Sequence, residues 1–274
     1  MVVGMAVCMI VGIGGVHADT NGPPAGRLYE VHGVKLYTQI FGHGPPIVFL
    51  HGGLHGFDNS FARQRDYFSA FRTVIGIDQR GHGHSPDNSK PFSYQEMADD
   101  TAALIEKLGL GVVDVIGHSD GANVGLILAH DHPQLVRRLA ISGANLRSGL
   151  SPEETLRQSR RSPQDAAAKF PPQFRTQYQQ MSPDGPDHWF THVAKSEALW
   201  LQPVVIEPTA LKAINIPVLV IAGDHDFTSL EETTEIYRGL SKGQLLILPA
   251  TEHGTFEQRP ELLNAALKEF LEQP

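Results

Sequence analysis

Short, continuously apolar runs recur along the chain, each about as long as a buried β-strand. They occupy residues 46–50, 73–77, 112–116, 139–142, 218–222 and 245–248. Hydrophobicity that is continuous rather than alternating is typical of strands buried on both faces of a sheet. Residues 28–31 and 34–41 alternate instead and flank Gly33, which predicts an antiparallel hairpin before the first buried strand.

Segments with helical periodicity separate these runs. Ser-x-x-Glu patterns at residues 93–96 and 229–232 have the form of capping boxes. They predict one helix that stops at Gly109 and another that ends near Leu240. Pro260 opens the last helix, since proline is favoured at the first helical position. Strands that alternate with helices predict βαβ units and a largely parallel sheet, an α/β fold.

Residues 147–203 break this alternation because they contain no buried-strand run. A Ser-Pro-Glu-Glu sequence at 151–154 opens a polar helix, and further helical stretches cover about 166–180 and 188–200. A segment this long is unusual for a plain crossover connection. We therefore predict a helical cap insertion at 147–203 over a core made of residues 28–146 and 204–274. The alternative is an ordinary set of connecting helices.

Composition narrows the class of protein. The 274 residues are 41% hydrophobic and 19% charged, which fits one folded domain with an insertion and excludes a disordered chain. The net charge is −8 and no Lys/Arg cluster occurs, so a nucleic-acid or anionic-membrane surface is not expected. Cys8 is the single cysteine, and the pair His82 and His84 lacks the spacing of a metal site. We predict neither metal nor cofactor.

The first residues form a separate segment. Residues 1–16 are uncharged and mostly apolar, but too few to span a bilayer comfortably. Val16 and Ala18 give a small-x-small site, so residues 1–18 resemble a signal peptide and 19–27 a tether. This predicts a secreted or periplasmic protein without stable membrane insertion. An uncleaved apolar segment on a cytoplasmic protein is the alternative.

The strongest chemical signal is the sequence Gly-His-Ser-Asp-Gly at residues 117–121. It joins an apolar strand to a helix rich in Ala, Gly and Leu, which is the context that a G-x-S-x-G nucleophile elbow requires. Glycine is needed on both sides because larger side chains would strike the backbone at so sharp a turn. Ser119 is therefore the predicted nucleophile.

A serine hydroxyl needs a base, and the base needs a partner that orients it. His253 is the histidine that follows the last strand and precedes the final helix, so we assign it as the base. The acid is Asp224 or Asp226, in the loop after residues 218–222, and the G-x-x-D spacing from Gly223 favours Asp226. A local turn contact is expected for Asp224.

The tetrahedral intermediate also requires two N–H donors. One is the backbone N–H of Asp120, which follows the nucleophile. The other comes from the loop His-Gly-Gly after residues 46–50, with Gly53 preferred over Leu54. His51 is expected to support this loop rather than take part in the chemistry.

These residues together resemble the α/β-hydrolase fold superfamily. The markers are His51-Gly52-Gly53, the loop Asp78-Gln79-Arg80-Gly81-His82-Gly83-His84-Ser85, the elbow at 117–121, Gly223-x-x-Asp226 and His253. The resemblance implies a capped, mostly parallel eight-stranded sheet flanked by helices, and hydrolysis through an acyl-enzyme with no cofactor. It implies that the loop at 78–85 is structural, with its arginine bonding to nearby backbone. It does not identify a substrate.

Asp120 departs from the residue types common after the nucleophile. The G-x-S-D-G form resembles the branch that includes valacyclovir-hydrolase-like enzymes, which cleave amino-acid esters. A carboxylate there could bind a substrate ammonium group. Alternatively, it points sideways and bonds to the sheet edge or a loop. The aromatic residues Trp189, Phe190 and Trp200 either line an acyl pocket or pack the insertion onto the core.

The leading functional prediction is a serine hydrolase that cleaves a small-molecule carboxylic ester. Aminopeptidase-like or amino-acid-ester hydrolysis, lactone hydrolysis and perhydrolysis are alternatives of the same chemistry. A hydrolase-fold receptor with low turnover is an alternative of another class. The oligomeric state is left open.

Overall fold

The computed structural model describes residues 25–148, 150–202 and 205–274. Within them, eight strands form one sheet in the order β1-β2-β4-β3-β5-β6-β7-β8. Their bounds are Arg27–Val31, Val34–Phe41, Pro46–Leu50, Thr73–Ile77, Val113–His118, Val136–Ser142, Val218–Gly223 and Gly243–Leu248 for β1 to β8. The predicted α/β fold with a mostly parallel eight-stranded sheet is confirmed.

The strand order reverses direction at β3. β1 and β2 form the expected hairpin, β2 is antiparallel to β4, and all other neighbouring pairs are parallel. The chain passes from β3 to β4 on one side and then crosses back to β5 on the other side of β3. Ligands bind at such a switch point, at the carboxyl ends of the strands. Leu50 pairs with Gly117, so the loops that follow β3 and β5 begin side by side.

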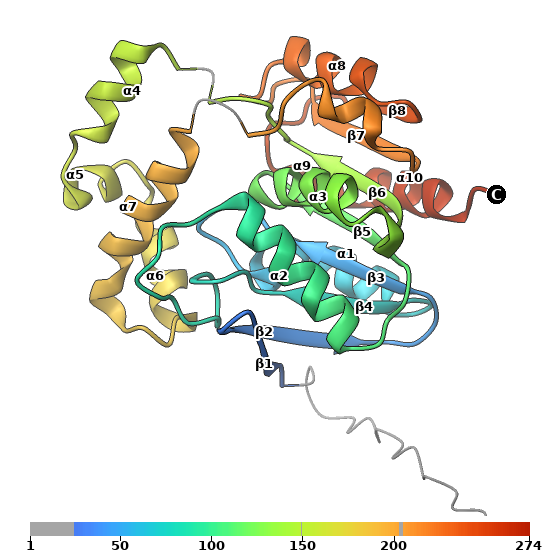
Figure 1. Ribbon diagram of the computed structural model, residues 1–274, viewed down its shortest axis with the longest axis horizontal. Coiled ribbons are helices and arrows are strands. Elements are labelled where there is room, and N and C mark those ends of the chain that lie inside the picture. Colours follow the sequence, from blue (N-terminus) through green and yellow to red (C-terminus); the bar gives the residue numbers. More distant parts are fainter. Residues whose placement is uncertain (1–24, 149, 203–204) are drawn as a thin grey trace, which may run out of the picture.

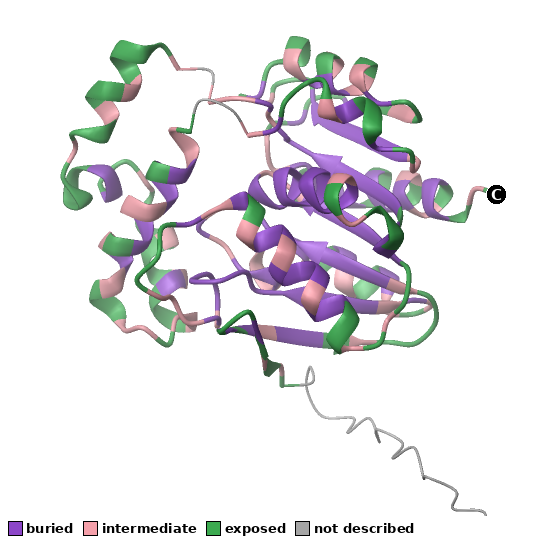
Figure 2. Ribbon diagram, viewed as in Figure 1, coloured by how far each residue is buried: buried purple, intermediate pink, exposed green. Residues whose placement is uncertain are grey.

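Helices cover both faces of the sheet. The helices between strands or after the last one are α1 (Phe57–Phe68), α2 (Tyr94–Lys107), α3 (Asp120–Asp131), α8 (Leu230–Gly239), α9 (Thr255–Gln258) and α10 (Pro260–Glu272). One buried cluster joins α2, α3 and α8 to the sheet, and a second joins α1, α9 and α10. Successive residues of β3 alternate between these clusters, Phe49 in one and Leu50 in the other. This explains the continuous apolar runs, and Figure 2 shows the sheet as the buried centre.

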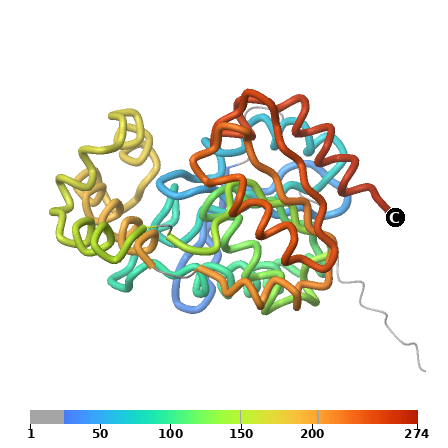
Figure 3. Tube along the Cα trace, turned by 90° about the horizontal axis from the view of Figure 1, so that it is seen from above, coloured from blue at the N-terminus to red at the C-terminus, as the bar shows by residue number. Residues whose placement is uncertain are grey.

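In the described residues, four α-helices lie between β6 and β7, namely α4 (Pro152–Ser159), α5 (Pro163–Ala167), α6 (Pro172–Met181) and α7 (Trp189–Trp200). They form a separate group beside the core, to the left in Figures 1 and 3. Trp189, Tyr178 and Val193 centre its own buried cluster, which Leu54 from the core joins. The group occupies the stretch where the cap insertion is predicted.

The predicted capping boxes are half formed. Ser93 accepts the N–H of Glu96, and Ser229 accepts that of Glu232. The carboxylate of Glu232 instead accepts the backbone N–H of Leu146, at 2.8 Å. Each helix begins where the sequence predicts, while its glutamate ties it to another element.

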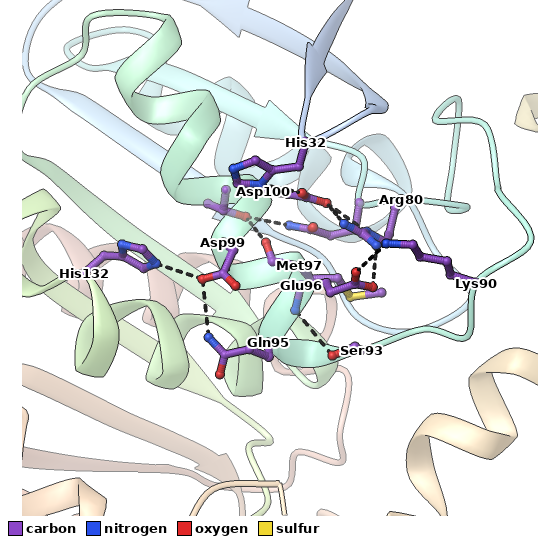
Figure 4. Close-up of polar contacts among 12 residues, drawn as sticks. His32, Arg80, Lys90, Ser93, Gln95, Glu96, Met97, Asp99, Asp100 and His132 are labelled. Atoms are coloured by element: carbon purple, nitrogen blue, oxygen red, sulfur yellow. Dashed lines mark hydrogen bonds and ion pairs between the residues drawn. The ribbon is translucent and has the colours of Figure 1, made fainter.

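The loop at 78–85 differs from expectation in one respect. Arg80 does not bond to nearby backbone: its guanidinium donates to the carboxylates of Asp100 (2.8 and 2.6 Å) and Glu96 (2.6 Å), both on α2. Figure 4 shows these contacts. A buried carboxylate needs a paired cation, and Asp100 has no exposed side-chain surface. The arginine therefore fastens the loop to α2.

The predicted signal peptide at 1–18 and most of the tether at 19–27 lie outside the described residues. Within the part that is described, no helix combines the length and the apolar character needed to cross a membrane.

Candidate active site

Ser119 sits at a strained turn between β5 and α3. Its φ and ψ are 53° and −118°, and it is the N-cap of α3. A Cβ at Gly117 would lie 2.4 Å from the carbonyl oxygen of Gly121, and one at Gly121 would lie 2.0 Å from that of Leu50. Neither position can hold a side chain, so the flanking glycines are required by close backbone approach, as the sequence analysis argued.

His253 and Asp226 are hydrogen-bonded to each other. The Nδ1–H of His253 donates to Oδ1 of Asp226 at 2.8 Å. The same oxygen accepts the N–H of Thr228 at 2.9 Å, and the Asp226 side chain has no exposed surface. The imidazole is thus fixed with its Nε2 facing away from the carboxylate, which is the orientation that a general base needs.

Asp224 points elsewhere. Its Oδ1 accepts the N–H of Thr251 at 3.0 Å and lies 2.8 Å from Nδ1 of His225. The N–H of Thr251, followed by His225, lowers the pKa of Asp224 to about 2. This is the local turn contact expected from the sequence, and it fastens the loop that leads to His253.

Ser119 and His253 both lie against the end of β6, at residues 142–143. The N–H of Ser119 donates to the carbonyl oxygen of Ser142 at 2.8 Å, and a Cβ on the next residue, Gly143, would lie 2.5 Å from Cε1 of His253. Across the described chain, Ser119 Oγ makes no hydrogen bond. In enzymes without substrate such bonds are often long and tighten only on binding.

The loop that carries Gly53 contacts the side chain of Asp120. A Cβ at Gly53 would lie 2.4 Å from Oδ2 of Asp120, so the loop after β3 touches the residue after the nucleophile. The backbone N–H groups of Gly53 and Asp120 have no acceptor among the residues that the structure describes. Leu54, the second candidate, has φ of 63° and packs into the cap cluster.

His51 supports this loop as predicted. Its Nδ1–H donates to the carbonyl of Gly52 at 2.8 Å, and its Nε2 accepts the N–H of Gln79 at 2.9 Å. Burial lowers the pKa of His51 to about 4, so the ring is neutral at pH 7.

The carboxylate of Asp120 is held by two side chains from different elements. The O–H of Tyr94, on α2, donates to Oδ1 at 2.6 Å, and the indole N–H of Trp200, on α7, lies 3.0 and 2.9 Å from Oδ1 and Oδ2. Burial raises the pKa of Asp120, against the lowering effect of these donors. Asp120 thus bonds to α2 and the cap rather than to a sheet edge. Its predicted contact with a substrate ammonium stays a prediction.

Two residues near His253 were not found from the sequence. Phe227 is 80% exposed, and its ring centroid lies 4.0 Å from that of His253. His118 donates its Nε2–H to the carbonyl of His253 at 2.9 Å, and burial lowers its pKa to about 3. The sequence did offer one signal for each: Phe227 directly follows Asp226, and His118 directly precedes Ser119.

Trp189, Phe190 and Trp200 all pack in the cap cluster, and the acyl-pocket role stays a prediction. Trp189 is buried at the centre of the cap cluster. Trp200 borders a cavity of about 230 Å³ with Phe170, Leu201 and the ion pair Lys169–Glu197. Because Trp200 also bonds to Asp120, this cavity and the nucleophile elbow share a wall.

The described residues offer no metal site. Among those described, no group of three or more His, Cys, Asp or Glu side chains is arranged to hold a metal ion.

Comparison with known proteins gives one family and several relatives. The model of a family described as alpha/beta hydrolase fold matches residues 45–184. The (E)-2-((N-methylformamido)methylene)succinate hydrolase of Acinetobacter baylyi is 25% identical over 243 residues, which cover 84% of this chain and 92% of that protein. Human serine hydrolase BPHL is 33% identical over 143 residues, 48% of this chain and 49% of that protein.

Among solved structures, Est816, described as an N-acyl homoserine lactone degrading enzyme, superposes with a TM-score of 0.75 at 25% identity. The match covers 89% of this chain and 100% of that one. Several curated relatives match over a shorter stretch: the RutD proteins of Caulobacter vibrioides align over 44% of their own length. The chain therefore spans less than half of these relatives.

Proposed function

The chain belongs to the alpha/beta hydrolase fold family, and from that premise we propose that it is a serine hydrolase that cleaves a carboxylic ester of a small molecule. One observation carries the proposal. The pair His253–Asp226, joined at 2.8 Å, lies against Gly143, and the neighbouring Ser142 bonds to Ser119 at its strained elbow. A strained residue held by its surroundings marks a functional site.

In the first half-reaction, Ser119 Oγ attacks the ester carbonyl carbon and His253 Nε2 takes the hydroxyl proton. Asp226 stabilises the imidazolium that forms. The backbone N–H groups of Gly53 and Asp120 bind the oxyanion. Collapse of the intermediate breaks the bond to the alkoxy group, which leaves as the alcohol with the proton from His253.

In the second half-reaction, His253 takes a proton from water, and the hydroxide attacks the acyl carbon. The same N–H groups bind the second oxyanion. Ser119 Oγ leaves, takes the proton back from His253, and the carboxylic acid is released. Apart from this water, the chain's own residues supply each group that the proposed reaction uses.

Lactone hydrolysis is the second candidate. It is supported by the similarity to Est816 over 89% of this chain. A lactone is a cyclic ester, so the same residues would open the ring without losing a separate alcohol.

The test is turnover of p-nitrophenyl esters from acetate to decanoate and of an N-acyl homoserine lactone, by the wild type and by Ser119→Ala. We expect turnover of at least one of these esters and a loss of roughly a thousandfold or more in the variant. Labelling by a fluorophosphonate, mapped to Ser119 by mass spectrometry, checks the nucleophile independently. Folded wild type that neither turns over an ester nor is labelled would refute the proposal.

We also propose that the protein is exported, to the periplasm or outside the cell. The uncharged run at 1–16 and the small residues Val16 and Ala18 support this. The intact mass of the protein recovered from a native host measures it: cleavage after Ala18 is expected, and a full-length cytoplasmic chain would contradict it.

A further inference from the structure

The last residue of the cap helix α7 contacts both loops that supply the proposed oxyanion donors. We propose that Trp200 is a positioning residue that holds these two N–H groups in register, so that the oxyanion hole depends on the docked cap. The inference rests on the proposed function and adds a residue to its machinery.

The first contact is with the elbow. The indole N–H of Trp200 donates to the Asp120 carboxylate at 2.9 Å. The hydroxyl of Tyr94, on α2, donates to the same carboxylate at 2.6 Å. Asp120 is the first residue of α3. Only its Cβ separates the carboxylate from the Cα that bears the proposed donor N–H. Two donors on the carboxylate therefore restrict how that peptide can turn.

The second contact is with the loop after β3. A Cβ at Gly53 would lie 2.7 Å from Cζ2 of the Trp200 ring and 2.4 Å from Oδ2 of Asp120. The indole and the carboxylate thus lie directly against the Cα of Gly53. Both proposed donors are fixed through the same two side chains.

This arrangement predicts an effect on the transition state rather than on substrate binding. Oxyanion donors act on charge that exists mainly in the transition state, and small misplacements of a positioned group are costly. Loss of the indole N–H should lower kcat and leave KM nearly unchanged. A residue that merely walls the substrate pocket should raise KM instead.

The experiment compares Trp200→Phe, which keeps a ring but loses the N–H, with Trp189→Phe. Trp189 is the matched control because it lies on the same helix, in the cap cluster, where its ring packs on Tyr178 and Phe170. On p-nitrophenyl acetate we expect Trp200→Phe to lose roughly tenfold to thirtyfold in kcat, less than the ~10²–10³ for deleting a donor outright. KM should change less than about threefold, and the control should keep its kcat.

Two further variants separate the hydrogen bond from the ring and keep the test decisive if the phenylalanine variant folds poorly. Trp200→His retains a ring N–H, so its kcat should lie above that of Trp200→Phe. In an Asp120→Ala background, Trp200→Phe should cost nothing more, because residues that act through one another are not additive.

The outcomes are distinct. Wild type without turnover or fluorophosphonate labelling would refute the proposed function, and this inference with it. If the wild type is active, two results would overturn the inference alone. One is a rise in KM at constant kcat in Trp200→Phe. The other is a loss of kcat in the double variant equal to the product of the losses in Trp200→Phe and Asp120→Ala.

Discussion

Oδ1 of Asp226 lies 2.8 Å from Nδ1 of His253, at the carboxyl ends of the neighbouring parallel strands β7 and β8. Asp224, only two residues earlier, bonds to Thr251 and His225 instead. The two aspartates of one loop therefore have different partners, and this difference can be measured.

Asp226→Asn should abolish most of the activity, whereas Asp224→Asn should not. An amide in place of the Asp226 carboxylate would favour the wrong tautomer of His253, and such a change typically costs roughly 10⁴ in kcat. Asp224→Asn should stay within about threefold, because it removes only a turn contact. Both are measured as kcat on p-nitrophenyl acetate. Comparable losses in the two variants would contradict the assignment of Asp226.

The inner strands could be predicted from the sequence because burial on both faces leaves a continuous apolar run. A strand such as Pro46–Leu50 is apolar at every position once each face is covered by helices. The elbow could be predicted for a similar reason: the clashes that exclude side chains at Gly117 and Gly121 act within a few residues and across one neighbouring strand.

Contacts between distant parts of the chain produce no local sequence pattern, so they could not be predicted. The bonds from Tyr94 and Trp200 to Asp120 join residues 26 and 80 positions apart. Arg80 was expected to bond to backbone, because the sequence does not show that α2 presents Asp100 and Glu96 to it. Cap docking was the least predictable part of the site, since it depends on tertiary packing alone.

Asp120→Asn tests whether the carboxylate selects charged substrates. An amide retains one oxygen acceptor for Tyr94 or Trp200 but loses the charge that would attract an ammonium group. If Asp120 binds such a group, the ratio of kcat/KM for phenylalanine p-nitrophenyl ester to that for p-nitrophenyl acetate should fall about tenfold. Equal losses on both esters would show that the carboxylate acts only within the protein.

His192→Phe should make the protein less sensitive to acid. His192 is buried on α7, with its ring stacked 4.8 Å from Tyr178 and edge-on 4.6 Å from His82. Burial, and then the neighbouring His82, lowers its pKa well below 6.5. The unfolded chain therefore binds a proton that the folded chain does not, and stability is lost as pH falls below about 6.5.

Between pH 6.5 and 5, such a group removes about 2 kcal/mol from the free energy of unfolding. Urea unfolding at pH 7.5 and 5.0 measures this difference. Phenylalanine keeps the ring in place and should make the loss smaller by about that amount. Equal losses in wild type and variant would contradict the prediction.

Asp87→Asn should loosen the cap. The Asp87 carboxylate is nearly buried and binds Lys195 at 2.7 and 2.8 Å and His188 at 2.8 Å, both from the cap segment. Removing its charge leaves Lys195, which is 15% exposed, without its partner. The expected cost is about 2–3 kcal/mol, somewhat below that of breaking a fully buried pair.

Tryptophan fluorescence during urea unfolding reports this cost at the cap, because both tryptophans of the chain lie on α7. Glu235→Gln is the matched control, since its pair with Arg147 is exposed on both sides and should contribute below about 1 kcal/mol. A similar shift in the two variants would mean that Asp87 does not anchor the cap.

The backbone of Ser119 should store measurable strain. With φ of 53° and ψ of −118°, an L-residue here costs about 1–3 kcal/mol, whereas glycine adopts positive φ freely at an entropic cost of roughly 0.5–1 kcal/mol. Ser119→Gly and Ser119→Ala both lack the nucleophile, and only the alanine variant keeps the strain. We therefore expect the glycine variant to be more stable to urea by about 1 kcal/mol, although both are inactive. An alanine variant as stable as the glycine variant would mean that the elbow is relaxed, and that its geometry follows from packing at Gly117 and Gly121 without an energetic cost at the serine.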